Sequence, residues 1–289
     1  MLQLSVYAEI DAFLAAAATD LARDEVTNGL ILGVALRLKQ DPARFEHAPF
    51  LATVQEGDVL VAAGVMTPPY GLLVYAAVDE PRPALHLIAE RLVADAWPLP
   101  TVNGVAAVSH AFAETWQALT GGTVKELMAL RVFELRTVTP PPPPPGHFRP
   151  ATAADADLVL AWYDAFHAEA VPDEAAPRLT HVERAIAEGN VFLWEDGGRP
   201  VSLAGKGRRT AHGISVGPVY TPPELRGRGY ASACVAALSQ QILDEGKQFC
   251  TLFTDLANPT SNHIYQQLGY RPVCDFAEYA LRAAKYFRR

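Results

Sequence analysis

The stretch "ELRGRGYASACV", residues 224–235, joins a basic glycine turn to an alanine-rich apolar run. Two glycines alternate with two arginines over residues 226–229, and the apolar residues that follow recur at helical spacing. The turn comes shortly after "ISVGPVYT", residues 214–221, whose composition indicates a strand. A strand, a glycine turn and a helix start in this order favour an anionic ligand, because the first N–H groups of a helix and its dipole attract negative charge.

Two familiar phosphate motifs do not fit this turn. A P-loop needs Gly-Lys followed by Ser or Thr, and no such triplet occurs. A dinucleotide fingerprint needs a third glycine or an alanine where Ser232 stands, and an acidic residue at the end of the next strand. Asp244 and Glu245 fall instead at the end of the expected helix.

The surrounding residues predict an α/β fold with a mixed sheet flanked by helices. Helices are expected at residues 155–170, 181–189, 230–242 and 258–268, and strands at residues 191–195, 200–208, 214–221 and 248–256. The pair Gly217-Pro218 predicts a bulge or splay in the third of these strands.

Six consecutive prolines, residues 140–145, divide the chain. Such a run favours the polyproline II conformation and predicts a stiff spacer; an SH3-type ligand is the alternative, which would need flanking basic residues and a matching partner. We expect one domain at residues 1–137, a linker at 138–147 and a second domain at 148–289. A chain of 289 residues is natural for two domains.

Composition excludes several classes of protein. A net charge of −8 argues against nucleic-acid binding, which needs a basic face. The three cysteines are far apart in sequence, so we expect buried thiols rather than a disulfide framework or a metal site. No apolar run is long enough to span a membrane, and the first residues lack a basic segment, so a cytoplasmic protein is expected.

The glycine turn resembles the coenzyme A pyrophosphate loop of the GNAT acetyltransferases, whose pattern is [QR]-x-x-G-x-[GA]. Arg226, Gly229 and Ala231 stand at its defining positions. A strand with Val216, Gly217, Pro218 and Val219 precedes it, and an N-P-x-S-x-x-x-Y helix follows. The resemblance covers residues 148–281.

This resemblance implies acetyl-CoA as the acyl donor and a set of coenzyme-binding residues. The main chain of the splayed strand would bind the pantetheine arm, the turn would bind the pyrophosphate, and the start of the last helix would lie near the thiol: Val219, Tyr220, Thr221, Arg226, Gly227, Arg228, Gly229, Tyr230, Ala231, Asn258 and Ser261. Tyr265 falls where the family keeps a tyrosine that protonates the departing thiolate. Alternatively, Tyr265 is a half-buried aromatic and Asn258 only a helix cap.

The general base is not readable from the sequence. Many GNAT enzymes use a glutamate on the splayed strand, but this strand offers Ser215 and no carboxylate. His212, Glu195, Asp173 and Glu174 are the candidates, and each can also be a surface residue.

Residues 1–137 repeat the expected order of helices and strands but lack the residues that would bind the coenzyme and protonate the thiolate. "DEPR", residues 79–82, stands where a coenzyme loop would be and contains no glycine. Trp116 matches Tyr265, and an indole cannot serve as the acid. We interpret this half as a degenerate GNAT-like domain that walls the acceptor pocket or forms a homodimer surface; an unrelated α/β domain is the alternative.

The expected function is an acetyl-CoA-dependent N-acetyltransferase that acts on a small-molecule or peptide amine by direct attack, without nucleic acid, membrane or metal. The competing hypothesis is a non-catalytic acetyl-CoA-binding sensor or interaction protein.

Overall fold

The computed structural model describes residues 1–77, 79–170 and 178–284. Its strands are β1 (Leu2–Val6), β2 (Phe50–Glu56), β3 (Val59–Met66), β4 (Leu72–Ala76), β5 (Thr101–Val105), β6 (Thr123–Leu135), β7 (His147–Pro150), β8 (Val191–Asp196), β9 (Arg199–Arg209), β10 (Gly213–Tyr220), β11 (Phe249–Asp255) and β12 (Arg271–Arg282). Its α-helices are α1 (Ile10–Leu21), α2 (Gly29–Gln40), α3 (Arg82–Ala94), α4 (Ala106–Thr120), α5 (Ala156–Ala170), α6 (Leu179–Ala187), α7 (Tyr230–Asp244) and α8 (Pro259–Gln267).

The two halves of the chain repeat one order of elements. From β1 to β6 and again from β7 to β12, a strand is followed by two helices, three strands, a helix, a strand, a helix and a strand. The repetition and the α/β class predicted from the sequence are therefore confirmed. The short strands β1, β5 and β7 were not predicted, because runs of four or five residues carry too little periodic signal.

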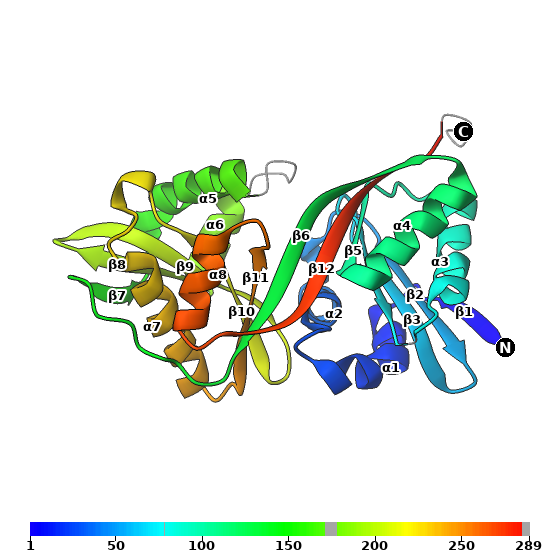
Figure 1. Cartoon of the computed structure of the whole chain (residues 1–289), viewed down its shortest axis with the longest axis horizontal. Helices are drawn as coiled ribbons and strands as arrows, with labels where there is room; N and C mark the ends of the chain where they lie inside the picture. Colours follow the sequence, from blue (N-terminus) through cyan, green and yellow to red (C-terminus); the bar gives the residue numbers. More distant parts are fainter. Residues whose placement is uncertain (78, 171–177, 285–289) are drawn as a thin grey trace.

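All twelve strands form one sheet, in which the halves exchange their last strands. The order is β1-β2-β3-β4-β5-β12-β6-β11-β10-β9-β8-β7. Strand β12 inserts between β5 and β6, so it pairs with two strands of the N-terminal half, while β6 pairs with β11 of the C-terminal half. These two long strands cross the middle of the molecule, and the C-terminal end of β12 consequently lies beside the N-terminal half (Figure 1).

Helices cover both faces of the sheet, and each half has one buried cluster on each face. In the N-terminal half α1 and α2 cover one face and α3 and α4 the other. In the C-terminal half α5 and α6 cover one face, and α7 and α8 the other. The rings of Phe276 on β12 and Phe253 on β11 meet edge to face, with their centroids 5.2 Å apart. This contact lies where the sheets of the two halves join.

The proline run is held along the C-terminal half. Residues 136–146 form no helix or strand. The Thr139 N–H donates to the Leu268 carbonyl at 2.9 Å, and Trp194 Nε1 donates to the Pro145 carbonyl at 2.8 Å. The linker therefore runs past the end of α8 to β8 as a segment anchored at two points.

The cysteines differ in part from the expectation. Cys234 and Cys250 are buried, as predicted, but Cys274 on β12 is partly exposed. The prediction was wrong for Cys274 because its strand lies at the junction of the halves, where Cys274 Sγ approaches the Thr27 hydroxyl at 3.8 Å. In the portion of the chain that the structure describes, no helix combines the length and the apolar character that a membrane crossing requires.

Candidate active site

Strands β10 and β11 separate part way along their length. Their parallel pairing ends at Ser215 and Thr251. Beyond this point β10 stays paired with β9, and β11 stays paired with β6. The register of β10 against β9 shifts between Val216 and Val219, around the predicted Gly217-Pro218 pair. The sequence prediction of a bulged, splayed strand is thus confirmed, since β10 and β11 no longer pair beyond Ser215 and Thr251.

The glycine turn lies between the end of β10 and the start of α7. Gly227 has φ +77° and Gly229 has φ +83°, a left-handed conformation that favours glycine. Gly229 is the N-cap of α7, and no side chain caps this helix. A Cβ built on Gly227 meets no described atom within 4 Å, and one on Gly229 meets only Pro144 Cβ at 3.9 Å. Space therefore remains on the Cβ side of both glycines, beside a helix start whose first N–H groups favour an anion.

Arg226 is anchored to α5 and to the end of β10. Its Nε donates to the Thr221 carbonyl at 2.9 Å, and its Nη2 donates to Glu169 at 2.7 Å. The guanidinium also lies over the Tyr220 ring, with its carbon 5.8 Å from the ring centroid. These contacts hold the first residue of the turn in place.

The residues at the start of α7 have separate partners. The Tyr230 hydroxyl donates to Asp196 Oδ2 at 2.6 Å, and this bond raises the pKa of the phenol. Arg228 is exposed, and its Nη2 reaches the Glu224 carbonyl at 3.3 Å. Tyr230 therefore pins the turn to the β8–β9 hairpin, while the Arg228 side chain lies at the surface, near the turn.

The three strand residues predicted to bind the pantetheine arm have different surroundings. Val219 packs against the cluster under α7 and α8. The Tyr220 carbonyl accepts from the Ser202 hydroxyl at 3.2 Å, and the Thr221 carbonyl accepts from Arg226.

Helix α8 begins as the sequence predicts. Asn258 is its N-cap, and the Asn258 side chain accepts from the Ser261 N–H at 3.0 Å. Asn262, which the sequence reading missed, donates to the carbonyls of Asp255 and Asn258 at 3.0 and 2.8 Å and thereby ties α8 to the end of β11. Asn258 is thus a cap, and a cap can also contact a ligand.

Tyr265 lies one turn further along α8, on the side of the helix that packs toward the core. It contacts the same buried cluster as Val219, and its ring meets that of Tyr270 edge to face at 5.9 Å. Burial raises the pKa of Tyr265 to about 12. Its hydroxyl forms no hydrogen bond with any described residue, so at neutral pH it is a protonated donor without a protein acceptor.

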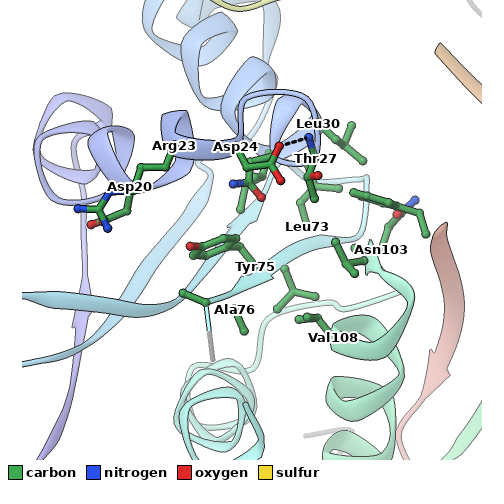
Figure 2. A pocket seen from close by; sticks show the side chains of 17 residues that line it. Asp20, Arg23, Asp24, Thr27, Leu30, Leu73, Tyr75, Ala76, Asn103 and Val108 are labelled. Atoms are coloured by element: carbon green, nitrogen blue, oxygen red, sulfur yellow. Dashed lines mark hydrogen bonds and ion pairs between the residues drawn. The ribbon is translucent and has the colours of Figure 1, made fainter. Parts of the chain in front are cut away.

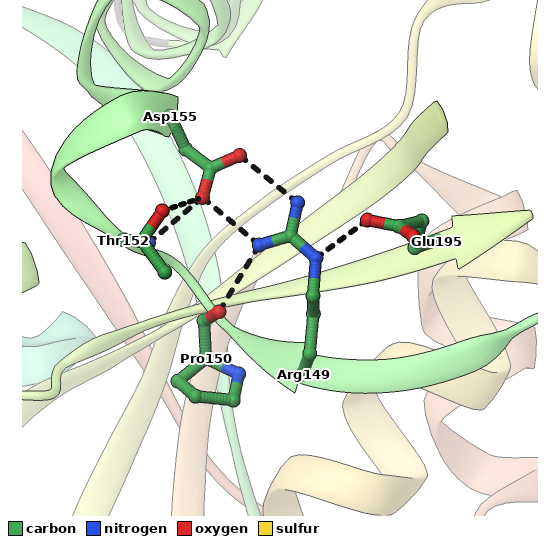
Figure 3. A network of polar contacts seen from close by, with 5 residues as sticks. All are labelled: Arg149, Pro150, Thr152, Asp155 and Glu195. Carbon is green, nitrogen blue, oxygen red and sulfur yellow. Dashed lines mark hydrogen bonds and ion pairs between the residues drawn. The ribbon is translucent and has the colours of Figure 1, made fainter. Parts of the chain in front are cut away.

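Of the base candidates, two are engaged with charged side chains. Glu195 accepts from Arg149 Nε at 2.6 Å, in a network that also joins Arg149 to both carboxylate oxygens of Asp155 (Figure 3). His212 Nδ1 lies 2.7 Å from Glu25 of the N-terminal half, at the end of β10 opposite to the splay. Asp173 and Glu174 lie outside the described residues.

Several site residues could not have been found from sequence. Glu169, Asp196 and Ser202 act on the turn or the splayed strand from positions distant in the chain. Single acidic or hydroxyl residues carry no local pattern that marks such a role.

In the N-terminal half, the positions equivalent to the glycine turn and to Tyr265 lack the features described above. Helix α3 starts after Pro81 and has a second proline at position 83, so two of the N–H groups that a helix start normally offers are missing. Asp79 and Glu80 precede it and would repel phosphate. Trp116 is buried in the core against Phe112.

Comparisons with known proteins agree with this geometry. Residues 197–279 match the family described as FR47-like protein. A search of curated proteins gives no significant match.

Among solved structures, three similar chains extend over almost the whole molecule. A GNAT-family acetyltransferase from Colwellia psychrerythraea has 9% identity and a TM-score of 0.60, covering 97% of this chain and 100% of its own. A GCN5-related N-acetyltransferase from Sphaerobacter thermophilus has 16% identity and a TM-score of 0.63, covering 98% and 95%. A tandem GNAT protein from the clavulanic acid biosynthesis pathway has 13% identity and a TM-score of 0.59, covering 98% of each chain.

At these identities the likeness concerns the fold. Both halves have the same order of elements, and the family match falls on the half that carries the glycine turn. The chain has the fold of a tandem GNAT protein, with the FR47-like match in its C-terminal half.

Proposed function

We propose that the protein is an acetyl-CoA-dependent N-acetyltransferase whose reaction takes place in the C-terminal half. One observation carries the proposal: an uncapped glycine turn opens α7 beside two parallel strands that have separated. The turn suits a diphosphate, and the opening between the strands suits an extended arm that pairs with a strand edge.

Each part of the coenzyme has a proposed place. Backbone N–H groups of residues 226–231 hold the pyrophosphate, with Arg226 and Arg228 supplying positive charge. The edge of β10 at Val219, Tyr220 and Thr221 pairs with the pantetheine arm. Asn258 and Ser261, at the start of α8, lie toward the thiol end.

The chemistry needs one bond made and one broken. The acceptor amine attacks the thioester carbonyl, and N–H groups of β10 stabilise the charge that develops on the carbonyl oxygen. The new C–N bond forms as the C–S bond breaks, and the amine nitrogen loses one proton to water. Tyr265 donates a proton to the leaving thiolate, and the phenol is later reprotonated from water, so protons balance over the cycle.

The N-terminal half is proposed not to bind the coenzyme. Its α3 start lacks two N–H groups and has acidic residues before it. We propose that residues 1–137 instead support the acceptor side, because the segment before α2 and the start of α2 lie beside the paired ends of β10 and β11. Glu25 and Leu30 line a small pocket there, together with Ser215.

The test is acetyl-CoA turnover with a panel of primary amines, followed as release of free thiol. Acceptor-dependent thiol release that disappears in Gly229→Asp supports the proposal. Coenzyme binding by calorimetry without acceptor-dependent release would instead favour the non-catalytic acetyl-CoA-binding protein.

A further inference from the structure

The N-terminal half contains a cavity of about 400 Å³ that the proposed reaction does not use (Figure 2). It lies where β4 and β5 separate, on the face covered by α1 and α2. The parallel pairing of these strands ends at Val74 and Gly104; further along, β4 pairs with β3 and β5 with β12. Ligands of open α/β sheets bind in such crevices at the carboxyl ends of parallel strands, and the volume lies within the range of about 300–1,000 Å³ that is usual for small-molecule sites.

One side of the cavity is acidic. Asp20, Arg23 and Asp24 line it above the Tyr75 ring (Figure 2). Arg23 pairs with Asp20 at 2.8 Å, which leaves the charge of Asp24 without a cationic partner among the described residues. Asp24 Oδ1 accepts from the Thr27 N–H at 3.1 Å, which holds the carboxylate in position.

The electrostatic potential at the Tyr75 phenol is consistent with the negative charge on this side of the cavity. Burial raises the pKa of Tyr75, and the carboxylates of Asp20 and Asp24 raise it further, while Arg23 opposes them. The phenol therefore stays neutral at physiological pH, and the negative potential around it favours a cation over an anion.

One wall of the cavity includes Asn103, whose Oδ1 has no donor in the described part of the chain. This oxygen lies just beneath the surface, so a ligand N–H reaches it only when the Asn103 side chain turns toward the cavity. A buried unpaired carbonyl costs about 1–3 kcal/mol, which such a bond can recover. The remaining walls are mostly apolar and include Ile31, Leu73, Val108 and Phe276.

We propose that this cavity binds a small organic ammonium, a primary amine on an apolar body, at a site separate from the coenzyme turn. The ammonium lies near Asp24 and donates to Asn103 Oδ1 once that side chain turns toward it, while the body packs on the apolar walls. A nucleotide is a poor fit, because the α3 start that would hold its phosphates lacks N–H groups and follows two acidic residues. This site is independent of the proposed acetyl transfer.

Phenethylammonium and its neutral counterpart 2-phenylethanol are suitable probes, because they differ chiefly in charge. Titration calorimetry is performed on the full chain carrying Gly229→Asp, so that the result does not depend on coenzyme. We expect one ammonium per chain, bound at least tenfold more tightly than the alcohol. Equal affinities, or no binding of either probe at millimolar concentration, would overturn the proposal.

Two variants locate the bound probe. Asp24→Asn keeps an oxygen for the Thr27 N–H and removes the charge, and Asn103→Val removes the acceptor; each should weaken ammonium binding about tenfold. Asp58→Asn makes the same change in an exposed turn and should leave the ammonium affinity unchanged. Thermal unfolding checks that all variants are folded. Unchanged affinity in both Asp24→Asn and Asn103→Val would place the probe elsewhere. Displacement of the probe by acetyl-CoA from the chain with Gly229 intact, one for one, would also contradict a separate site.

Discussion

Arg226 and Glu169 form an ion pair, with Nη2 and Oε2 2.7 Å apart, at the mouth of the glycine turn. Both side chains are about half exposed, so the pair contributes little to folding stability, about 0–1 kcal/mol. Its importance lies in position: the first arginine of the proposed pyrophosphate site is held by a carboxylate from α5. A bound diphosphate must share Arg226 with that carboxylate.

Glu169→Gln should therefore strengthen coenzyme binding. Removing one negative charge beside a diphosphate in a solvated site is worth a few tenths of a kcal/mol to about 1 kcal/mol, so we expect about threefold higher affinity at low salt and a smaller gain at high salt. Calorimetry at two salt concentrations measures it. Glu183→Gln, on the exposed face of α6, is the matched control and should leave affinity unchanged. Weaker binding in Glu169→Gln would mean that the ion pair orders the turn.

Gly229→Asp should abolish coenzyme binding and leave the fold intact. The change adds a negative charge at the helix start and a side chain at φ +83°, at a strain cost of about 1–2 kcal/mol. Gly57→Asp imposes the same chemical change at φ +59°, where a Cβ meets nothing within 4 Å, in the β2–β3 turn. Both variants should melt at similar temperatures, and only Gly229→Asp should lose affinity. Full affinity in Gly229→Asp would remove the basis for the pyrophosphate site.

Calorimetry of the unmodified chain should give one coenzyme per chain, because α3 lacks the N–H groups that α7 offers. Arg82→Asp, at the start of α3, should leave both stoichiometry and affinity unchanged. A stoichiometry of two would show that the N-terminal half binds coenzyme after all.

Tyr265→Phe separates catalysis from packing. The ring and its contact with Tyr270 remain, so coenzyme affinity and melting temperature should barely change, while turnover falls by roughly 10²-fold, the usual worth of a positioned acid. With a pKa of about 12, the phenol stays protonated from pH 7 to 10, and the Tyr265-dependent part of the rate should be flat over that range.

Tyr270→Phe is the matched control for that change. The Tyr270 hydroxyl pairs with Ser239 at 2.8 Å in the core, so its removal should lower stability by about 1 kcal/mol and spare turnover. If Tyr265→Phe turns over at the normal rate, another group protonates the thiolate; if it mainly loses coenzyme affinity, Tyr265 is a binding residue.

Asp155→Asn should cost about 2 kcal/mol of unfolding free energy at pH 7, since Arg149 makes two charged hydrogen bonds to this carboxylate. These bonds hold the pKa of Asp155 well below its usual value. The stabilisation is therefore complete above the unfolded pKa of about 3.9 and is lost as the pH falls through the folded pKa.

Urea unfolding of both proteins between pH 7 and 3 measures this pH dependence. The difference between them should shrink below about pH 4. Asp164→Asn, an exposed change on α5, controls for loss of charge. A difference that stays constant down to pH 3 would show that the ion pair is not its source.

The features that the sequence determined are local. The strand before the turn, the glycines at 227 and 229, the Asn258 cap and the place of Tyr265 on its helix all follow from side-chain period and turn chemistry within about a dozen residues. The prediction that the N-terminal half has no coenzyme turn is equally local, because it depends on Pro81 and the acidic residues before it.

The tertiary structure decided the features that join distant residues. The local sequence pattern of β6 and β12 would be the same whether each strand paired within its own half or with the other half. Their actual pairing depends on packing over both halves. Glu169 beside Arg226, Glu25 beside His212, and the acidic cavity with Asn103 arise in the same way. Side chains far apart in the chain meet there because the sheet and helices bring them together, and such contacts leave no periodic trace in the sequence.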